Sequence, residues 1–338
     1  MSAWDQRSTE ENTLHIPLRR PDEFTDPVAV ITGGWSQERD RSLLSGRTVD
    51  DALTGMGIKT HVLDLSVPSG ELLARLADMD LAVLAIAGRG AEDGRLQGLL
   101  ETLGIPYTGS GVLASATGMH KLYAKTLVSA AGVRVPRAVG INSAADTDEE
   151  AARIMERLGL PVIVKPVSEG GSIGLHVVTA DDFTLSAAIS HAEEGEWMAE
   201  AFHSGRSVSV GVLEDRHGGV HVLPALEART PNGVYSYAAK RGSAECDYYC
   251  PARISEETLD ELRRQAVAAH RALHCYSYSR HDFVVEDDGK AVWLEVNTLP
   301  GLSRGGNLAQ MALADGLSYE QLLLHILRGA HVDRRARP

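Results

Sequence analysis

Short apolar runs alternate with segments of helical periodicity over the first third of the chain. The predicted strands cover residues 28–31, 61–65 and 81–86, and the predicted helices cover residues 39–56 and 69–78. In the first helix, apolar positions from Leu43 to Leu53 recur at the spacing of one buried face. Ser69 is the expected N-cap of the second helix. This alternation predicts a parallel α/β unit, which binds ligands at the carboxyl ends of its strands.

A different pattern begins near residue 121, and strands dominate from residue 207 onward. Helices are predicted over residues 121–131, 146–158, 256–273 and 319–328, and strands over residues 137–141, 162–165, 197–202, 207–213 and 220–228. We therefore expect a polar extension at residues 1–27, an N-terminal α/β domain at 28–120, a central domain at 121–206, a C-terminal domain at 207–330 and a basic tail at 331–338.

The composition is that of a globular protein and argues against several classes. Hydrophobic residues make up 43% of the 338 positions, and no apolar run approaches the ~18–20 residues of a membrane span. The formal net charge of −13 argues against a nucleic-acid surface. Cys246 and Cys250 are close together, but no second pair completes a metal site, so free thiols in a reducing cytoplasm are expected.

Three oxygen-bearing side chains fall on two predicted strands that flank a turn. Asp282 lies in the run 279–285, residues 287–289 are typical of a hairpin turn, and the return strand carries Glu295 and Asn297. Because residues two apart on a strand share a face, Glu295 and Asn297 point the same way. Carboxylate and amide oxygens suit a hard cation such as Mg²⁺, which takes further ligands from phosphates. A half-buried hairpin with solvated acids is the alternative interpretation.

A β-branched run at residues 162–165 ends in Lys165, and a glycine-rich turn follows at residues 169–174. This pattern predicts a buried strand that delivers one cation beside backbone N–H groups able to approach phosphates. It is not the usual phosphate-binding loop, because the lysine precedes the glycines, and it lacks the dinucleotide-binding spacing. Together with the hairpin acids, it indicates a site for a nucleoside triphosphate and Mg²⁺.

Further motifs follow in a fixed order. They are Gly33-Gly34-Trp35-Ser36-Gln37-Glu38-Arg39, Gly88-Arg89-Gly90-Ala91-Glu92-Asp93-Gly94, Pro106-Tyr107-Thr108-Gly109-Ser110-Gly111, Lys121, Val164-Lys165-Pro166, Tyr248-Tyr249-Cys250-Pro251-Ala252 and Asn297-Thr298-Leu299-Pro300-Gly301. In this order the chain resembles the D-alanine–D-alanine ligase family of ATP-grasp enzymes from about residue 28 to 327. The resemblance implies a three-domain α/β ATP-grasp architecture, in which an N-terminal parallel α/β domain precedes two α+β domains that clamp ATP. It also implies an enzyme that activates an amino-acid carboxylate as an acyl phosphate, which an amine then attacks.

The resemblance implies an ATP-binding role for Lys121, Lys165, Ser172, Glu200 and Lys240. Lys121 and Lys165 resemble the pair that holds the α- and β-phosphates, and Lys240 resembles a mobile-loop lysine that reaches the γ-phosphate. For each lysine a solvated surface position is the alternative. Glu200 resembles the linker acid whose neighbouring backbone contacts adenine.

The resemblance also implies the groups around the reacting atoms. The family's Mg²⁺ ligands correspond to Asp282, Glu295 and Asn297, and two ions, replaceable by Mn²⁺, would bridge phosphate oxygens. Arg280 resembles the arginine that stabilises the tetrahedral intermediate, with Gly301 supplying an N–H to the same oxyanion. Glu38 resembles the acid that binds the ammonium of the first amino acid. A structural ion pair for Arg280 and a helix-dipole position for Glu38 are the alternatives.

Several family positions differ around the amino acids. Ala87 replaces a histidine, Gly171 replaces the first serine of the glycine turn, and Arg241 replaces a tyrosine. In the family, that serine and tyrosine are the partners of the glutamate, so Glu38 loses both. Arg241 is expected to pair with Glu38 or with a substrate anion.

On the acceptor side, the segment 303–308 lacks the serine that binds the second substrate's carboxylate. Arg304 or Asn307 is expected to take its place. Ser207 stands where the family has a ribose-binding glutamate.

D-Alanyl-D-alanine, for the peptidoglycan of the cell wall, is the default product by resemblance. A related dipeptide, amide or ester ligase of changed specificity is one alternative, and a non-catalytic ATP-binding regulator is another. The regulator would be expected to lose its metal ligands first, and this chain keeps all three. The expected partners are small amino acids, with no nucleic acid or membrane, and a homodimer in the cytoplasm is the candidate assembly.

Overall fold

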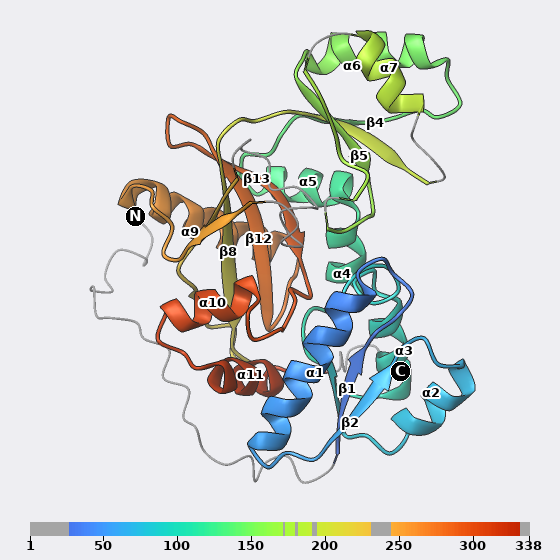
Figure 1. Cartoon of the computed structure of the whole chain (residues 1–338), viewed down its shortest axis with the longest axis vertical. Coiled ribbons are helices and arrows are strands. Elements are labelled where there is room, and N and C mark those ends of the chain that lie inside the picture. The colour runs from blue at the N-terminus through green and yellow to red at the C-terminus, as the bar shows by residue number, and fades with distance from the viewer. Residues whose placement is uncertain (1–26, 172, 180–181, 191–194, 231–244, 332–338) are drawn as a thin grey trace.

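The computed structural model describes residues 27–171, 173–179, 182–190, 195–230 and 245–331. Three sheets follow one another along the chain, one parallel and two antiparallel. In Figure 1 the parallel sheet and the smaller antiparallel sheet lie at opposite ends of the molecule. This architecture confirms the predicted α/β class, while the domain boundaries at residues 120 and 206 stay a proposal.

The parallel sheet forms from the apolar runs of the first third of the chain. Its order is β2-β1-β3, with β1 at Val28–Thr32, β2 at Thr60–Asp64 and β3 at Leu81–Leu84. Apolar side chains of α1 (Arg39–Gly55), α2 (Ser69–Leu76) and α3 (Arg95–Leu103) share one core with these strands. The predicted N-cap at Ser69 is wrong. Pro68 takes that place, because its carbonyl already accepts the N–H groups of Glu71 and Leu72.

The small antiparallel sheet has the order β4-β7-β5-β6 and follows α4 (Val112–Met119) and α5 (Lys121–Ala130). Its strands are β4 (Ala138–Gly140), β5 (Val162–Pro166), β6 (His176–Val178) and β7 (Trp197–Ala201). The helices α6 (Thr147–Leu158) and α7 (Asp182–Ser190) pack against each other and enclose its core. This sheet carries Lys165 on β5 next to Glu200 on β7, because the two strands pair directly.

The larger antiparallel sheet has the order β11-β10-β8-β12-β13, with β9 beside β8. Its strands are β8 (Arg206–Glu214), β9 (Val220–Val222), β10 (Leu226–Arg229), β11 (Asp247–Tyr249), β12 (Tyr278–Val285) and β13 (Ala291–Asn297). The helix α9 (Glu256–Ala272) packs on β8, β12 and β13. The single strand predicted over residues 220–228 is therefore two strands, since Pro224 between them has no N–H to donate.

The first and last parts of the chain share one hydrophobic core. The helices α10 (Asn307–Ala314) and α11 (Tyr319–Arg328) pack against each other, and α11 also packs against α1 (Figure 1). Near the chain end, His331 exchanges two backbone hydrogen bonds with Tyr107, which itself extends the parallel sheet. This shared core holds α1 opposite the segment that follows β13.

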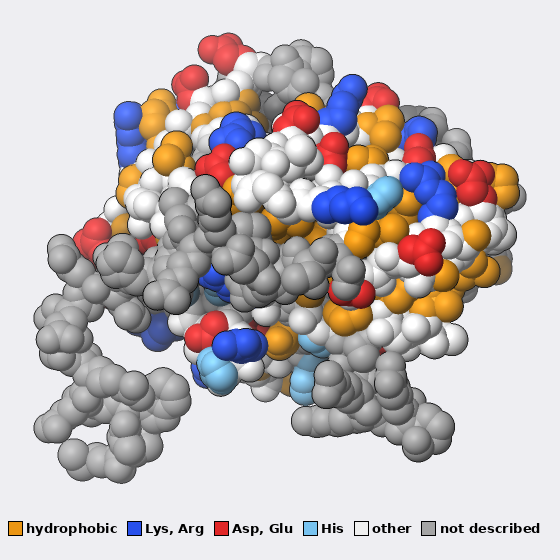
Figure 2. Space-filling model, turned by 90° about the horizontal axis from the view of Figure 1, so that it is seen from below, with side chains coloured by type: hydrophobic (Ala, Val, Ile, Leu, Met, Phe, Trp, Pro, Cys, Tyr) orange, Lys and Arg blue, Asp and Glu red, His pale blue; other side chains and the backbone are white. Residues whose placement is uncertain are grey.

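The surface mixes charges of both signs. Figure 2 shows acidic and basic side chains interspersed over one face of the molecule. In the part of the chain that the structure describes, no helix combines the length and the apolar character that crossing a membrane requires.

Candidate active site

The β12–β13 hairpin brings together the side chains that the sequence predicted as metal ligands. Its register places Asp282 opposite Glu295, and Arg280 opposite Asn297. The Asn297 Nδ2 group donates to Asp282 Oδ2 over 3.2 Å, and the Ser209 hydroxyl donates to Asp282 Oδ1 over 2.7 Å. Arg280 donates from Nε and Nη2 to the two oxygens of Asp282 over 2.8 and 2.9 Å. Two acids, an amide and a guanidinium thus converge on one face.

These residues suit a hard cation. Among the described residues no three His, Cys, Asp or Glu side chains group as a metal site. A cation held by the carboxylates of Asp282 and Glu295 and the amide oxygen of Asn297 therefore needs further oxygen ligands, which phosphates supply. Asn297 would have to present its Oδ1 atom in place of Nδ2. Since Arg280 neutralises Asp282 in the present arrangement, a cation would share that carboxylate with it.

A cavity lies beside this hairpin, between the two antiparallel sheets. Its apolar wall is formed by Ile163, Leu175, Phe202, Val208, Phe283 and Val284, and its polar end by Lys121, Lys165, Glu200, Asp282 and Glu295. An apolar slot that ends in cations and carboxylates is suited to a flat base joined to a polyphosphate. The structure therefore brings the predicted Lys121, Lys165 and Glu200 to the same cavity.

Glu200 is held between two lysines. It is 1% exposed, and its carboxylate lies 2.5 Å from Lys165 Nζ and 3.0 Å from Lys125 Nζ. Burial opposes its ionisation, but the two ammonium groups outweigh burial and lower the pKa of Glu200. Burial also lowers the pKa of Lys125, to about 8, against the attraction of Glu200. The sequence analysis missed Lys125, although it follows Lys121 by one helical turn on α5.

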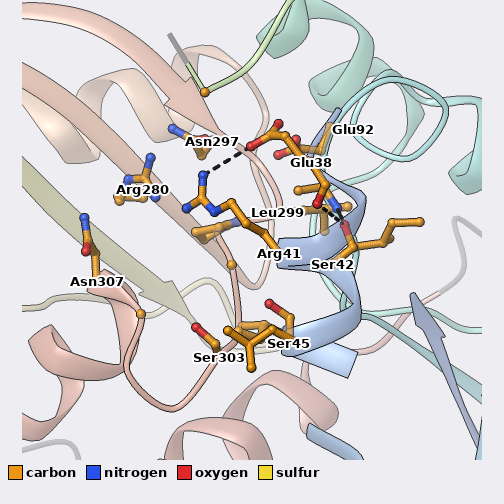
Figure 3. A pocket seen from close by; sticks show the side chains of 18 of the residues that line it. Glu38, Arg41, Ser42, Ser45, Glu92, Arg280, Asn297, Leu299, Ser303 and Asn307 are labelled. Atoms are coloured by element: carbon orange, nitrogen blue, oxygen red, sulfur yellow. Dashed lines mark hydrogen bonds and ion pairs between the residues drawn. The ribbon is translucent and has the colours of Figure 1, made fainter. Parts of the chain in front are cut away.

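A second cavity, of about 450 Å³, lies between the start of α1, the glycine turn after β5 and the segment after β13. Figure 3 shows its labelled side chains converging from these elements. Polar lining residues that the figure labels are Glu38, Arg41, Ser42, Ser45, Glu92, Arg280, Asn297, Ser303 and Asn307. Glu295 lines both cavities, so the two meet at the hairpin.

Glu38 is the N-cap residue of α1, and its carboxylate lies against the glycine turn. A Cβ on Gly170 would come within 2.5 Å of Glu38 Oε2, so glycine is what allows this close approach. Within the described residues, the carboxylate pairs with Arg41, whose Nη1 lies 3.3 Å from Glu38 Oε1. Glu92, also in this cavity, accepts the N–H of Gly88 over 2.6 Å. Burial first, and then the charge of Glu38, raise the pKa of Glu92 to about 7.

Comparison with known proteins decides the family. A family model described as D-ala D-ala ligase C-terminus matches residues 127–328. The D-alanine–D-alanine ligase of Nitrosospira multiformis is 39% identical over 308 residues, which cover 90% of this chain and 97% of that protein. The corresponding ligase of an Anaeromyxobacter species is 41% identical over 310 residues, with 90% and 96% covered. The chain belongs to the D-alanine–D-alanine ligase family.

Solved structures agree with the fold of this family. The D-alanine–D-alanine ligase of Bacillus anthracis complexed with ATP superposes with a TM-score of 0.76 at 28% identity, covering 90% of this chain and 97% of that chain. The VanG D-Ala:D-Ser ligase of Enterococcus faecalis gives 0.77 at 28% identity, covering 89% and 98%. The ATP-grasp architecture that the sequence resemblance implied is confirmed.

Against this family background, the predicted substrate residues differ in where they lie. Gly301 and Asn307 line the second cavity with Glu38. Arg304 is not among its lining residues. Its guanidinium pairs with Glu320 over 2.7 Å and lies 4.5 Å from the ring of Tyr319. The structure thus does not bring Arg304 into the cavity, because the turn before α10 directs it toward α11.

Three predicted residues, Ser172, Lys240 and Arg241, fall outside the described residues. Two lining residues that the sequence analysis did not assign are Glu92 and Arg41. The signal for Arg41 was available, since it follows Glu38 by three positions at the start of a helix and so shares its face. Glu92 stands in one of the quoted glycine-rich motifs, but nothing in its spacing indicated that it would lie near Glu38.

Proposed function

We propose that the protein is an ATP-dependent ligase that joins an amino-acid carboxylate to an amine, with D-alanyl-D-alanine as the default product. The γ-phosphoryl group of ATP passes to the carboxylate, giving an acyl phosphate and ADP. The amine then attacks the acyl carbon, phosphate leaves, and the amine loses a proton. The products are an amide, ADP and phosphate.

The observation that carries this proposal is the meeting of the two cavities at the β12–β13 hairpin. A carboxylate bound beside Arg280 and a triphosphate bound beside Lys165 would approach each other across Glu295. Such positioning converts a bimolecular encounter into a reaction between neighbours. The family membership and a structural neighbour that is complexed with ATP support the same assignment.

Residues that line the two cavities would each contribute to this reaction. The ammonium groups of Lys121 and Lys165 balance phosphate charge. Asp282, Glu295 and Asn297 would hold Mg²⁺, which would neutralise phosphate charge, and we expect two such ions that Mn²⁺ can replace. Arg280 and the N–H of Gly301 stabilise the oxyanion formed when the amine attacks. Lys240 keeps its proposed role at the γ-phosphate.

The identity of the acceptor is a separate part of the proposal. One structural neighbour, VanG, is a D-Ala:D-Ser ligase, so this fold serves more than one acceptor. Asn307 lines the cavity after β13 and is our candidate for binding the second carboxylate. A homodimer in the cytoplasm is the proposed assembly, which light scattering of the purified chain tests.

The deciding experiment measures phosphate release and product mass. The full-length protein is incubated with ATP and Mg²⁺, and with D- and L-amino acids singly and in pairs. Ligase activity predicts ADP and phosphate in equal amounts with the amide, and no ATP consumption without a carboxylate substrate. ATP binding without consumption over the whole panel would instead favour a non-catalytic regulator.

A further inference from the structure

A second guanidinium, besides that of Arg280, lies in the cavity of about 450 Å³ that Glu38 lines, which we propose binds the first amino acid. Arg41 projects from the third residue of α1 into this cavity, and Figure 3 shows it between Glu38 and Arg280. A guanidinium carries five N–H donors. Within the described residues Arg41 makes one hydrogen bond, from Nη1 to Glu38 Oε1. Most of its donor capacity is therefore available to a molecule in the cavity.

The pair between Arg41 and Glu38 is a loose one. Its single contact measures 3.3 Å, and the Arg41 side chain is 46% exposed. By contrast, Arg39 on the same helix holds Asp64 by two hydrogen bonds of 3.0 and 2.6 Å. An exposed pair with one long contact contributes little to stability. A ligand can thus separate Arg41 from Glu38 at small cost.

The charges of Arg41 and Glu38 indicate which ligand would bind favourably in this cavity. This step rests on the proposed function, in which Glu38 receives the ammonium of the first amino acid. When that ammonium takes Glu38, Arg41 loses its hydrogen bond and keeps the charge attraction of Glu92, which Arg280 also shares. A methyl side chain would give this cation no hydrogen-bond acceptor. A carboxylate side chain would give it a planar, two-oxygen partner, which suits guanidinium geometry.

We propose that Arg41 is a specificity residue that binds a carboxylate side chain, so that an acidic amino acid replaces the default D-alanine as the first substrate of the proposed ligase. The cavity of about 450 Å³ has the space for it, since pockets of ~300–1,000 Å³ enclose drug-sized ligands. Binding exchanges one loose ion pair for two substrate pairs, ammonium with Glu38 and side-chain carboxylate with Arg41. Asp40 and Glu92 also line the cavity. The substrate's side-chain carboxylate must therefore reach the guanidinium directly. Because their side chains differ in length, aspartate and glutamate should differ in kcat/KM.

The test compares Arg41→Met with wild type, using Arg47→Met as the matched control. Arg47 is an exposed arginine of α1 that does not line the cavity. Phosphate release is followed with ATP, Mg²⁺ and each of D- and L-aspartate, D- and L-glutamate, D- and L-alanine and D-lactate as first substrate, with D-alanine as acceptor. Mass spectrometry identifies each product.

Wild type should use one acidic amino acid at least about 10-fold better than alanine in kcat/KM. Arg41→Met should lower kcat/KM for that acid by about 30-fold, equivalent to about 2 kcal/mol, mainly through KM. Its activity with alanine should change less than about threefold, and Arg47→Met should match wild type with both. Arg41→Lys should recover part of the loss, because it keeps the charge without the two-donor geometry.

Turnover with alanine or D-lactate that equals or exceeds turnover with every acidic amino acid would overturn the proposal and leave the ligase function intact. An equal loss of kcat/KM for all substrates in Arg41→Met would also overturn the proposal and leave the ligase function intact. Absence of phosphate release with every substrate, while ATP still binds, would overturn the ligase function as well.

Discussion

The buried cluster of Glu200, Lys165 and Lys125, beside the cavity proposed to bind ATP, can be tested at Lys125. Its side chain is 4% exposed and its ammonium lies 3.0 Å from Glu200. It also donates to the carbonyl of Leu294 over 2.7 Å, so it ties α5 to β13. Burial nevertheless lowers its pKa from 10.5 to about 8. The folded protein therefore releases this proton more readily than the unfolded chain does.

The sign of the pH dependence follows from proton counting. Between about pH 8 and 10.5 the unfolded chain keeps the Lys125 proton while the folded protein has lost it. Stability rises with pH wherever the unfolded state binds more protons. The contribution of this one lysine should grow by about 2–3 kcal/mol between pH 7 and pH 10. It should be fully present above pH 10.5 and lost as the pH falls through 8.

The assay is urea unfolding of wild type and Lys125→Met at several pH values from 7 to 10, in the absence of nucleotide. Other groups titrate in this range, so the quantity of interest is the difference between the two proteins. That difference should move in favour of wild type by about 2–3 kcal/mol as the pH rises. Lys290→Met is the control, because Lys290 is an exposed hairpin residue paired with Asp288. A wild-type-to-variant difference that stays constant from pH 7 to 10 would refute the reasoning.

Four other substitutions test the candidate site. Asp282→Asn and Glu295→Gln should each lower turnover by about 100-fold or more at saturating Mg²⁺, with phosphate release as the measurement; near-normal turnover in both would contradict the metal assignment. Gly170→Ala should raise KM for the first amino acid at least about tenfold with little change for ATP, because the new Cβ displaces the Glu38 carboxylate; equal effects on both substrates would argue against it. Arg304→Ala should leave both Michaelis constants unchanged and alter the free energy of unfolding by less than about 1 kcal/mol, since its pair with Glu320 is exposed; a raised acceptor KM would restore its substrate role.

The nucleotide side of the molecule could be predicted from the sequence, because local patterns decide it. Two apolar strands joined by a tight turn set the register that places Asp282 opposite Glu295. A buried strand that ends in Lys165 likewise needs only its own neighbours. The prediction of one strand over residues 220–228 failed at Pro224. The strand breaks there because β9 and β10 pair with different parts of β8, which the local sequence does not reveal. The helix α10 was missed because it is short and begins after two glycines.

The amino-acid side could not be predicted in the same way, because segments far apart in sequence form it. Arg41 and Glu38 share a helical turn, but their distance from Arg280 is set by the core that joins α1 to α11. The direction of Arg304 is set by Glu320, which no local pattern around residue 304 reveals.

This division has a physical consequence for how substrate choice can change. Lys165 and Lys125 pair closely with the buried Glu200, and Arg280 pairs closely with Asp282, so replacing any one of them leaves a charge without its partner. In the cavity that Glu38 lines, Arg41 is held more loosely, by one contact of 3.3 Å with Glu38. A substitution there alters which substrate balances the cavity's charge without disturbing the buried cluster around Glu200. Substrate specificity can therefore change independently of the ATP chemistry, and Arg41 is the residue at which the structure lets that independence be measured.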